Sequence, residues 1–120
     1  MLPPLPELPG VTHRYETVGG VRLHYAEAGD GEPLLLVHGW PQHWWMWRDY
    51  IAPLAERFRV IAPDLRGHGR TTGDADTCSF VQIARDMFAL LDHLHVDRIS
   101  IAGISGGRLR STEMSATPSR

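Results

Sequence analysis

A serine flanked by glycines is the residue with the clearest chemical potential. Residues 103–107 read GISGG and match the pattern G-x-S-x-G. Glycines there permit a sharp turn from strand into helix, which strains the serine backbone and exposes its hydroxyl at the carboxyl edge of a sheet. We predict that Ser105 is a nucleophile and that Gly103 and Gly107 support this elbow. The alternatives are an ordinary glycine-rich turn and, more weakly, a dinucleotide site, whose spacing would be G-x-G-x-x-G.

A second motif, HGWP at residues 38–41, directly follows the apolar run 34–37. A serine that attacks an acyl carbon needs two backbone N–H groups to stabilise the resulting oxyanion. The residue after the nucleophile, Gly106, is expected to supply one N–H group, and Trp40 in the earlier loop the other. Loop-supporting roles are assigned to the neighbours of Trp40, namely His38, Gly39 and Pro41, with His38 organising the loop rather than acting as a base.

Two further groups of residues favour a structural interpretation. In PDLRGHG at residues 63–69, Asp64 and Arg66 are suited to satisfying loop backbone groups, so no chemical step is assigned to them. The tryptophans at positions 44, 45 and 47 are predicted to pack in the core. An alternative for the first two is the lining of an apolar acyl pocket.

Strands and helices alternate along the chain in the way that these motifs require. Segments 11–18 and 21–28 flank a Gly-Gly turn and predict a hairpin, and 34–37, 59–62 and 98–102 are short buried strands. Apolar residues at helical spacing follow Trp47, although Pro53 interrupts them. A second helix is predicted at 80–94, and Ser79 with Gln82 would form a capping box at its start. This pattern predicts an α/β fold with a mostly parallel sheet, an antiparallel amino-terminal hairpin and helices on both faces.

Composition excludes several other functions. The chain has 120 residues and a formal net charge of -2, and its 12 basic residues, all arginine, are scattered rather than clustered. We therefore expect no nucleic-acid partner. The single cysteine, Cys78, excludes an internal disulfide and a cysteine zinc site, and no metal or cofactor is implied. The sequence shows no secretory signal and no run of membrane-spanning length, which predicts a cytoplasmic protein without membrane attachment.

The three motifs, each after a predicted strand, together resemble the α/β-hydrolase family, and the stretch 34–69 is especially similar to its epoxide hydrolase and dehalogenase branch. That resemblance implies a hydrolase acting on a small ester, acyl or epoxide-like molecule. Members of that branch use an aspartate nucleophile, whereas this chain has Ser105. Serine suits ester and acyl cleavage through an acyl-enzyme, so that function is preferred and epoxide or halide chemistry is the alternative.

The resemblance also implies a catalytic acid and then a histidine after the nucleophile. The residues after Ser105 include Glu113 but no histidine, and all seven histidines precede it. We therefore expect a core truncated after the elbow and inactive alone, with a non-catalytic fragment or binding module as the further alternative. The expected division is a Pro-rich arm at 1–10, a partial α/β-hydrolase core at 11–107 and an atypical tail at 108–120. That tail lacks an apolar stripe and suggests a frameshift-like junction, which would leave strand 98–102 at the sheet edge.

Overall fold

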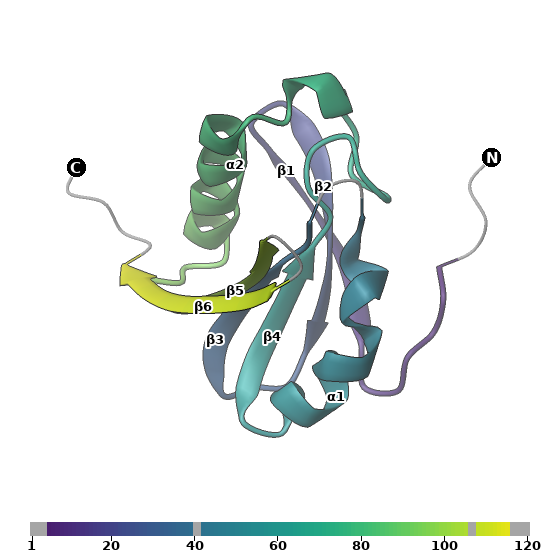
Figure 1. Ribbon diagram of the computed structural model, residues 1–120, viewed down its shortest axis with the longest axis vertical. Helices are drawn as coiled ribbons and strands as arrows, with labels where there is room; N and C mark the ends of the chain where they lie inside the picture. The colour runs from purple at the N-terminus through teal and green to yellow at the C-terminus, as the bar shows by residue number, and fades with distance from the viewer. Residues whose placement is uncertain (1–4, 40–41, 106–107, 116–120) are drawn as a thin grey trace.

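Six strands form one mixed sheet in the computed structural model, which describes residues 5–39, 42–105 and 108–115, with side chains up to Gly103 (Figure 1). The strands are β1 (Thr12–Val18), β2 (Val21–Ala28), β3 (Glu32–Val37), β4 (Phe58–Pro63), β5 (Arg98–Ser105) and β6 (Arg108–Ser115). Their order across the sheet is β1-β2-β4-β3-β5-β6.

The amino-terminal hairpin has the predicted turn. β1 and β2 are antiparallel, with a register that ends at the pair Val18 and Val21. Gly19 and Gly20 connect them at φ angles of 55° and 81°. Glycine enters this left-handed region without steric cost, which explains why a Gly-Gly pair favours a tight hairpin.

The centre of the sheet is parallel, as predicted, because β3 pairs in parallel with both β4 and β5. Along β3, Leu34 and Leu36 contribute to one core and Leu35 to the other. A strand covered on both faces needs apolar side chains in both directions, which explains its continuous apolar run.

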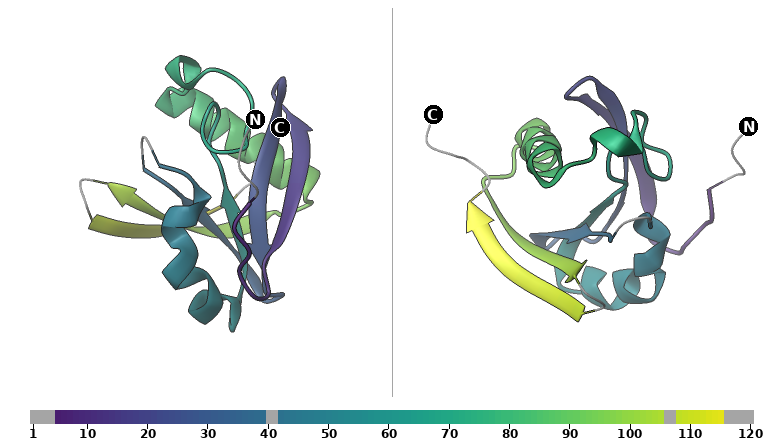
Figure 2. Two further views of the ribbon diagram at one scale, coloured as in Figure 1. Left: turned by 90° about the vertical axis from the view of Figure 1, so that its right-hand side faces the viewer. Right: turned by 45° about the horizontal axis from the view of Figure 1, so that its top comes forward.

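Helices cover both faces of the sheet (Figure 2). They are the 3₁₀ turn η1 (Trp44–Trp47), α1 (Arg48–Ala55), the 3₁₀ turn η2 (Ala75–Thr77) and α2 (Phe80–His93). α1 packs on the core that contains Leu34 and Leu36, and α2 on the core that contains Leu35. Pro53 lies inside α1, so the regular helix begins before the proline that was expected to interrupt it, and the 3₁₀ turn η1 leads into it.

The capping box predicted for α2 is only half formed. The Gln82 N–H donates to Ser79 Oγ at 3.1 Å, so Ser79 caps the helix. The Gln82 side chain does not return to Ser79 but donates to Asp86 Oδ1 at 2.9 Å. Asp86 is buried and also receives two bonds from Arg66, at 2.9 and 3.0 Å, and this competing acceptor explains the difference.

The strand β6 corrects two expectations about the carboxyl-terminal part. We expected an atypical tail at 108–120 and an exposed edge at 98–102. Instead, β6 pairs antiparallel with the whole of β5, so β5 is interior and β6 is the edge. Gly106 and Gly107 lie outside the described residues, but in sequence they carry the same Gly-Gly hairpin signal as positions 19 and 20. That signal competes with the serine motif in the same residues.

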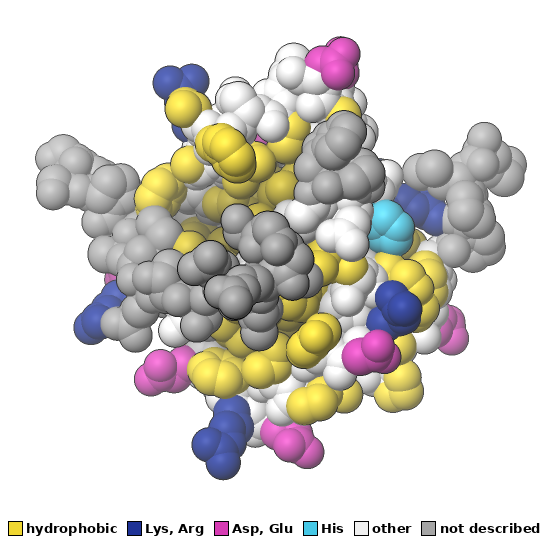
Figure 3. Space-filling view, in the orientation of Figure 1, with side chains coloured by type: hydrophobic (Ala, Val, Ile, Leu, Met, Phe, Trp, Pro, Cys, Tyr) yellow, Lys and Arg dark blue, Asp and Glu magenta, His cyan; other side chains and the backbone are white. Residues whose placement is uncertain are grey.

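Apolar side chains gather over α2 and the adjoining strands on the face shown in Figure 3. Here an apolar groove of about 190 Å³ lies between α2 and the sheet, lined by Ile83 and Met87 from α2 and by Val37 and Ile101 from the strands. Phe80 at the start of α2 is 91% exposed. Among the described residues, no helix has the length and apolar character needed to cross a membrane.

Candidate active site

The carboxyl ends of β3 and β5 lie side by side and bring two of the predicted motifs together. The parallel register pairs Leu36 with Ala102 and Val37 with Gly103. The loop that begins at His38 and the serine motif that contains Ser105 therefore start from neighbouring positions at one edge of the sheet. Ligand sites of α/β folds form in this place, where loops leave the carboxyl ends of adjacent parallel strands.

Gly103 lies against β3 at close range. A Cβ atom added at Gly103 would be 3.3 Å from the Val37 carbonyl oxygen and 3.8 Å from Val37 Cβ. The first distance is tighter than an ordinary contact, so a side chain here would press the two strands apart.

Ser105 is the last residue of β5 and pairs with Arg108 of β6. The sequence predicts a strand-to-helix turn at this point, whereas the structure has a strand on each side of residues 106–107. Gly106 and Gly107 lie outside the described residues, as do Trp40 and Pro41 in the first loop. The structure therefore locates the backbone of Ser105 at the shared strand edge and leaves the elbow and both predicted oxyanion donors as predictions.

His38 is bound to the backbone through both ring nitrogens. The Leu65 N–H donates to His38 Nε2 at 2.9 Å, and His38 Nδ1 lies 2.9 Å from the Gly39 carbonyl oxygen. Only the neutral Nδ1–H tautomer satisfies both bonds. Burial lowers the pKa of His38, against the opposing effect of the Gly39 carbonyl, so the neutral form is favoured. A ring held in this way has no free nitrogen to act as a general base.

Asp64 is the polar centre of the loops beside this edge. Its side chain is fully buried and accepts from the Trp44 N–H at 2.7 Å, from His24 Nδ1 at 2.7 Å and from the Arg70 N–H at 2.9 Å. Burial alone would raise the pKa of Asp64, but these hydrogen bonds outweigh it and lower the pKa. The carboxylate is therefore ionised and acts as an acceptor for three segments at once.

Two histidines extend this cluster to the hairpin. His24 Nε2 lies 2.9 Å from His13 Nδ1, and His24 is completely buried. His24 Nδ1–H donates to the ionised carboxylate, and the other ring nitrogen of His13, Nε2, lies 3.4 Å from the Pro6 carbonyl oxygen. Sequence reasoning gave neither residue a role. The alternation that turns β1 and β2 residues to a common face was visible, but the partner Asp64 lies 40 residues from His24.

The tryptophans after the first loop are core residues. Trp44 and Trp47 are 2% and 1% exposed, and both belong to the core beneath α1, against which Trp45 also packs. Trp44 further contacts the His13 ring edge-on, with ring centroids 4.9 Å apart. The packing interpretation therefore holds for Trp44 and Trp47.

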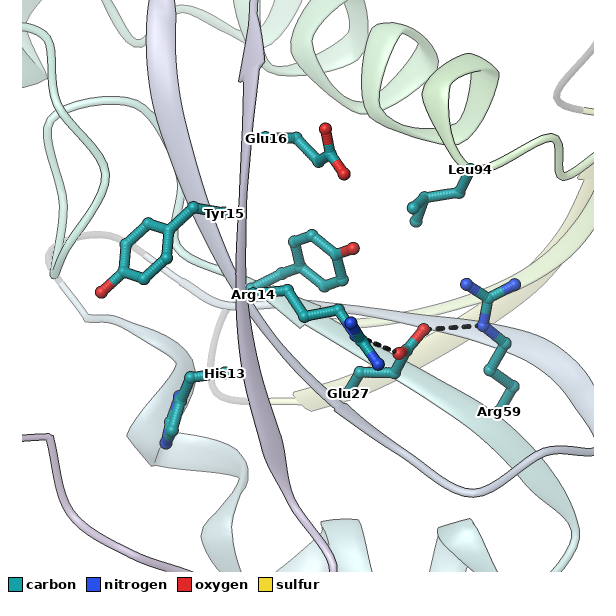
Figure 4. A pocket seen from close by; sticks show the side chains of 8 residues that line it. His13, Arg14, Tyr15, Glu16, Glu27, Arg59 and Leu94 are labelled. Atoms are coloured by element: carbon teal, nitrogen blue, oxygen red, sulfur yellow. Dashed lines mark hydrogen bonds and ion pairs between the residues drawn. The ribbon is translucent and has the colours of Figure 1, made fainter.

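A shallow hollow beside the hairpin is a separate feature (Figure 4). Glu27 lies between Arg14 and Arg59 and accepts from each at 2.7 Å. Both guanidinium groups are already bound to this one carboxylate, and we assign the hollow no ligand. Within the described ranges, no three histidine, cysteine, aspartate or glutamate side chains are grouped to hold a metal ion.

Comparison with known proteins identifies close relatives. Residues 32–116 match the family model described as "alpha/beta hydrolase fold". The chain is 43% identical over 97 residues to a soluble epoxide hydrolase of Corynebacterium sp. (strain C12), covering 81% of this chain and 34% of the relative. It is 35% identical over 102 residues to epoxide hydrolase 1 of Siraitia grosvenorii, covering 82% and 33%.

Solved structures give the same result. An epoxide hydrolase from Vigna radiata superposes with a TM-score of 0.76 at 32% identity, covering 85% of this chain and 34% of that one. The chain therefore spans about a third of the length of the relatives that it matches.

Proposed function

Because this chain belongs to the α/β-hydrolase fold family, we propose that it is the nucleophile-bearing part of a hydrolase that cleaves small ester or acyl compounds through Ser105. The observation that carries this proposal is the pairing of Val37 with Gly103. It starts the HGWP loop and the serine motif at neighbouring strand ends, which is the arrangement needed to bring a hydroxyl and oxyanion donors to one carbonyl group.

In the proposed reaction, a base takes the Ser105 hydroxyl proton while Oγ attacks the acyl carbon. The negative oxygen that forms is bound by the Trp40 and Gly106 N–H groups. Collapse of this intermediate breaks the bond to the leaving oxygen, which departs as the alcohol with the proton that the base took from Ser105. The base then takes a proton from water, whose oxygen attacks the acyl-enzyme, and returns it to Ser105 Oγ as the acid is released. No metal or cofactor takes part in this scheme. His38 and Gly39, with Pro41, support the first loop, and Gly103 and Gly107 support the second.

The acid and base of this reaction are proposed to come from outside these 120 residues. No histidine follows Ser105, and His38 and His24 have both ring nitrogens engaged in hydrogen bonds. General-base assistance contributes roughly 10²–10⁴-fold to such reactions. The 120-residue polypeptide alone is therefore expected to give no useful turnover.

Epoxide hydrolysis is a second candidate, favoured by the names of the relatives. The nucleophile type argues against it. A carboxylate that opens an epoxide leaves an ester, which water can cleave at the carbonyl carbon. A serine alkoxide would leave an ether without a carbonyl carbon, so the enzyme would stay alkylated.

A fusion to the carboxyl-terminal two-thirds of the Corynebacterium relative would test both candidates. With Ser105, the fusion is expected to hydrolyse p-nitrophenyl butyrate and to form no diol from styrene oxide. Ser105→Asp should reverse this preference, and Ser105→Ala is the inactive control. Diol formation by the Ser105 fusion would establish the epoxide function instead. Ester hydrolysis that survives Ser105→Ala would overturn the role of Ser105.

A further inference from the structure

We propose that Asp64 is a positioning residue for the loop between β3 and η1, and that with the adjacent Leu65 amide it holds both described ends of that loop. This inference rests on the proposed function for its catalytic meaning, because the loop contains the proposed oxyanion donor. Its structural content rests on contacts at His38 and Trp44. The dipeptide 64–65 follows β4, the neighbour of β3 in the sheet.

The two ends of the loop are held by different groups of this dipeptide. At the first end, the Leu65 N–H donates to His38 Nε2 at 2.9 Å. At the second end, Asp64 Oδ1 accepts the Trp44 N–H at 2.7 Å. Trp44 begins η1, where a helical turn leaves its first N–H groups without partners. A short bond to a buried carboxylate is the strong kind of cap for such a group.

Asp64 is itself fixed from several sides. Its N–H donates to the His24 carbonyl oxygen at 2.9 Å, and its own carbonyl oxygen accepts from Thr71 Oγ1 at 2.7 Å. Gly69, at a φ of 51°, packs so closely on the carboxyl group that a Cβ there would overlap it. The carboxylate is therefore held in place, and it fixes Trp44 through Oδ1 while the adjacent Leu65 N–H fixes His38.

Three donors around position 64 explain why an ionised carboxylate is needed there. Asp64 Oδ2 accepts from both His24 Nδ1–H and the Arg70 N–H, while Oδ1 serves Trp44. An amide keeps only one acceptor oxygen, and its NH2 group in the other position would point hydrogens at a group that already donates. Asp64→Asn therefore keeps the shape of the side chain and removes its capacity to bind all three partners.

The test is amide hydrogen exchange by NMR, read relative to the global stability of each variant. Asp64→Asn is expected to speed exchange of the Trp44 amide by about ten- to a hundredfold, as loss of a charged hydrogen bond implies. The ¹⁵N shift of the accepting His38 Nε2 should move as the Leu65 N–H shifts with its neighbour, while Nδ1 stays protonated. Asp86→Asn is the matched control, since Asp86 is an equally buried carboxylate bound to Arg66 and Gln82. It should leave the Trp44 and His38 signals unchanged.

Equal effects of the two substitutions on Trp44 and His38 would overturn the proposal. The hydrogen bonds of Asp64 and Leu65 to the two loop ends, with those that fix Asp64, form what we call the Asp64 clamp. The wild-type protein gives a second criterion that does not depend on a variant folding: the Trp44 and Leu65 amides must exchange slowly, and fast exchange at either excludes the clamp. These readouts are independent of esterase activity. An inactive fusion with intact Trp44 and His38 signals would reject the function of Ser105 and retain the positioning role.

Discussion

At the scale of single residues, the buried polar side chains His38 and Asp64 are committed to specific partners, whereas the buried Trp47 Nε1 has none among the described residues. His38 bridges two loops in its neutral form, and Asp64 binds three donors as an anion. Because each protonation state is needed for these bonds, pH acts directly on the loops beside the strand ends.

The stability of the protein is predicted to fall as the pH drops from about 7.5 to about 5.5. The pKa of His38 lies below its ordinary value of 6.5, so the unfolded chain binds more protons below that pH. Each such histidine contributes a slope of at most about 1.4 kcal/mol per pH unit. Burial and the neighbouring His24 also lower the pKa of His13, which adds to the slope. Asp64, with a pKa below 3.8, stays ionised across this range and contributes only in stronger acid.

Urea unfolding of three proteins would measure this effect. His38→Gln is expected to flatten the dependence of the unfolding free energy on pH, while His93→Gln, at the surface of α2, should keep the wild-type slope. An unfolding free energy of the wild-type protein that is equal at pH 7.5 and pH 5.5 would contradict the prediction.

At the scale of elements, the turn between β2 and β3 is packed against the junction of α1 and β4. Gly29 has a φ of 83°, and a Cβ there would collide with the carbonyl oxygens of Phe58 and Ala55. Gly20 has a nearly identical φ of 81° but nothing within 4 Å of the same position. A comparison of the two glycines therefore separates the cost of a left-handed backbone from the cost of a steric collision.

Gly29→Ala is therefore expected to destabilise the protein more than Gly20→Ala. Both changes incur about 1–2 kcal/mol for a side chain in the left-handed region. The collision at Gly29 adds about 1–3 kcal/mol, as overpacking does elsewhere. Thermal and urea unfolding of the two variants would measure the difference. Equal losses of unfolding free energy in the two variants would show that the turn at Gly29 can shift to accommodate a side chain.

The sequence predicts most elements because their signals are local. The Gly-Gly hairpin, the apolar run of β3 and the stripe of α2 each follow from adjacent residues. β6 escaped prediction because Gly106 and Gly107 belong to two competing patterns. The Asp64 cluster escaped it because its partners are 20 and 40 residues distant, and their contact depends on sheet order rather than on spacing.

At the scale of the whole molecule, the apolar groove beside α2 is a hydrophobic feature that opens to solvent among the described residues. Phe80 lines the groove and is 91% exposed, and the next residue in α2, Val81, is 61% exposed. Contiguous apolar surface of this kind promotes association.

We expect the 120-residue polypeptide to elute as larger species with rising concentration and to bind a hydrophobic dye. Replacing both Phe80 and Val81 by Gln should reduce both effects. Tyr50→Gln is the control, because Tyr50 is 47% exposed on α1 at the opposite face. If the wild-type protein is a monomer that binds no dye, and the double substitution changes neither result, this surface is excluded as a cause of association.

The Asp64 clamp has a consequence for the order in which the molecule is made. Every residue of the clamp lies between His13 and Thr71, and none belongs to α2 or β5. A ribosome completes the amino-terminal part of a chain first, at about 5–20 residues per second. The groups that hold the first loop have therefore all been synthesised seconds before Ser105 is added. In the nascent chain, the framework precedes the nucleophile that it is proposed to serve.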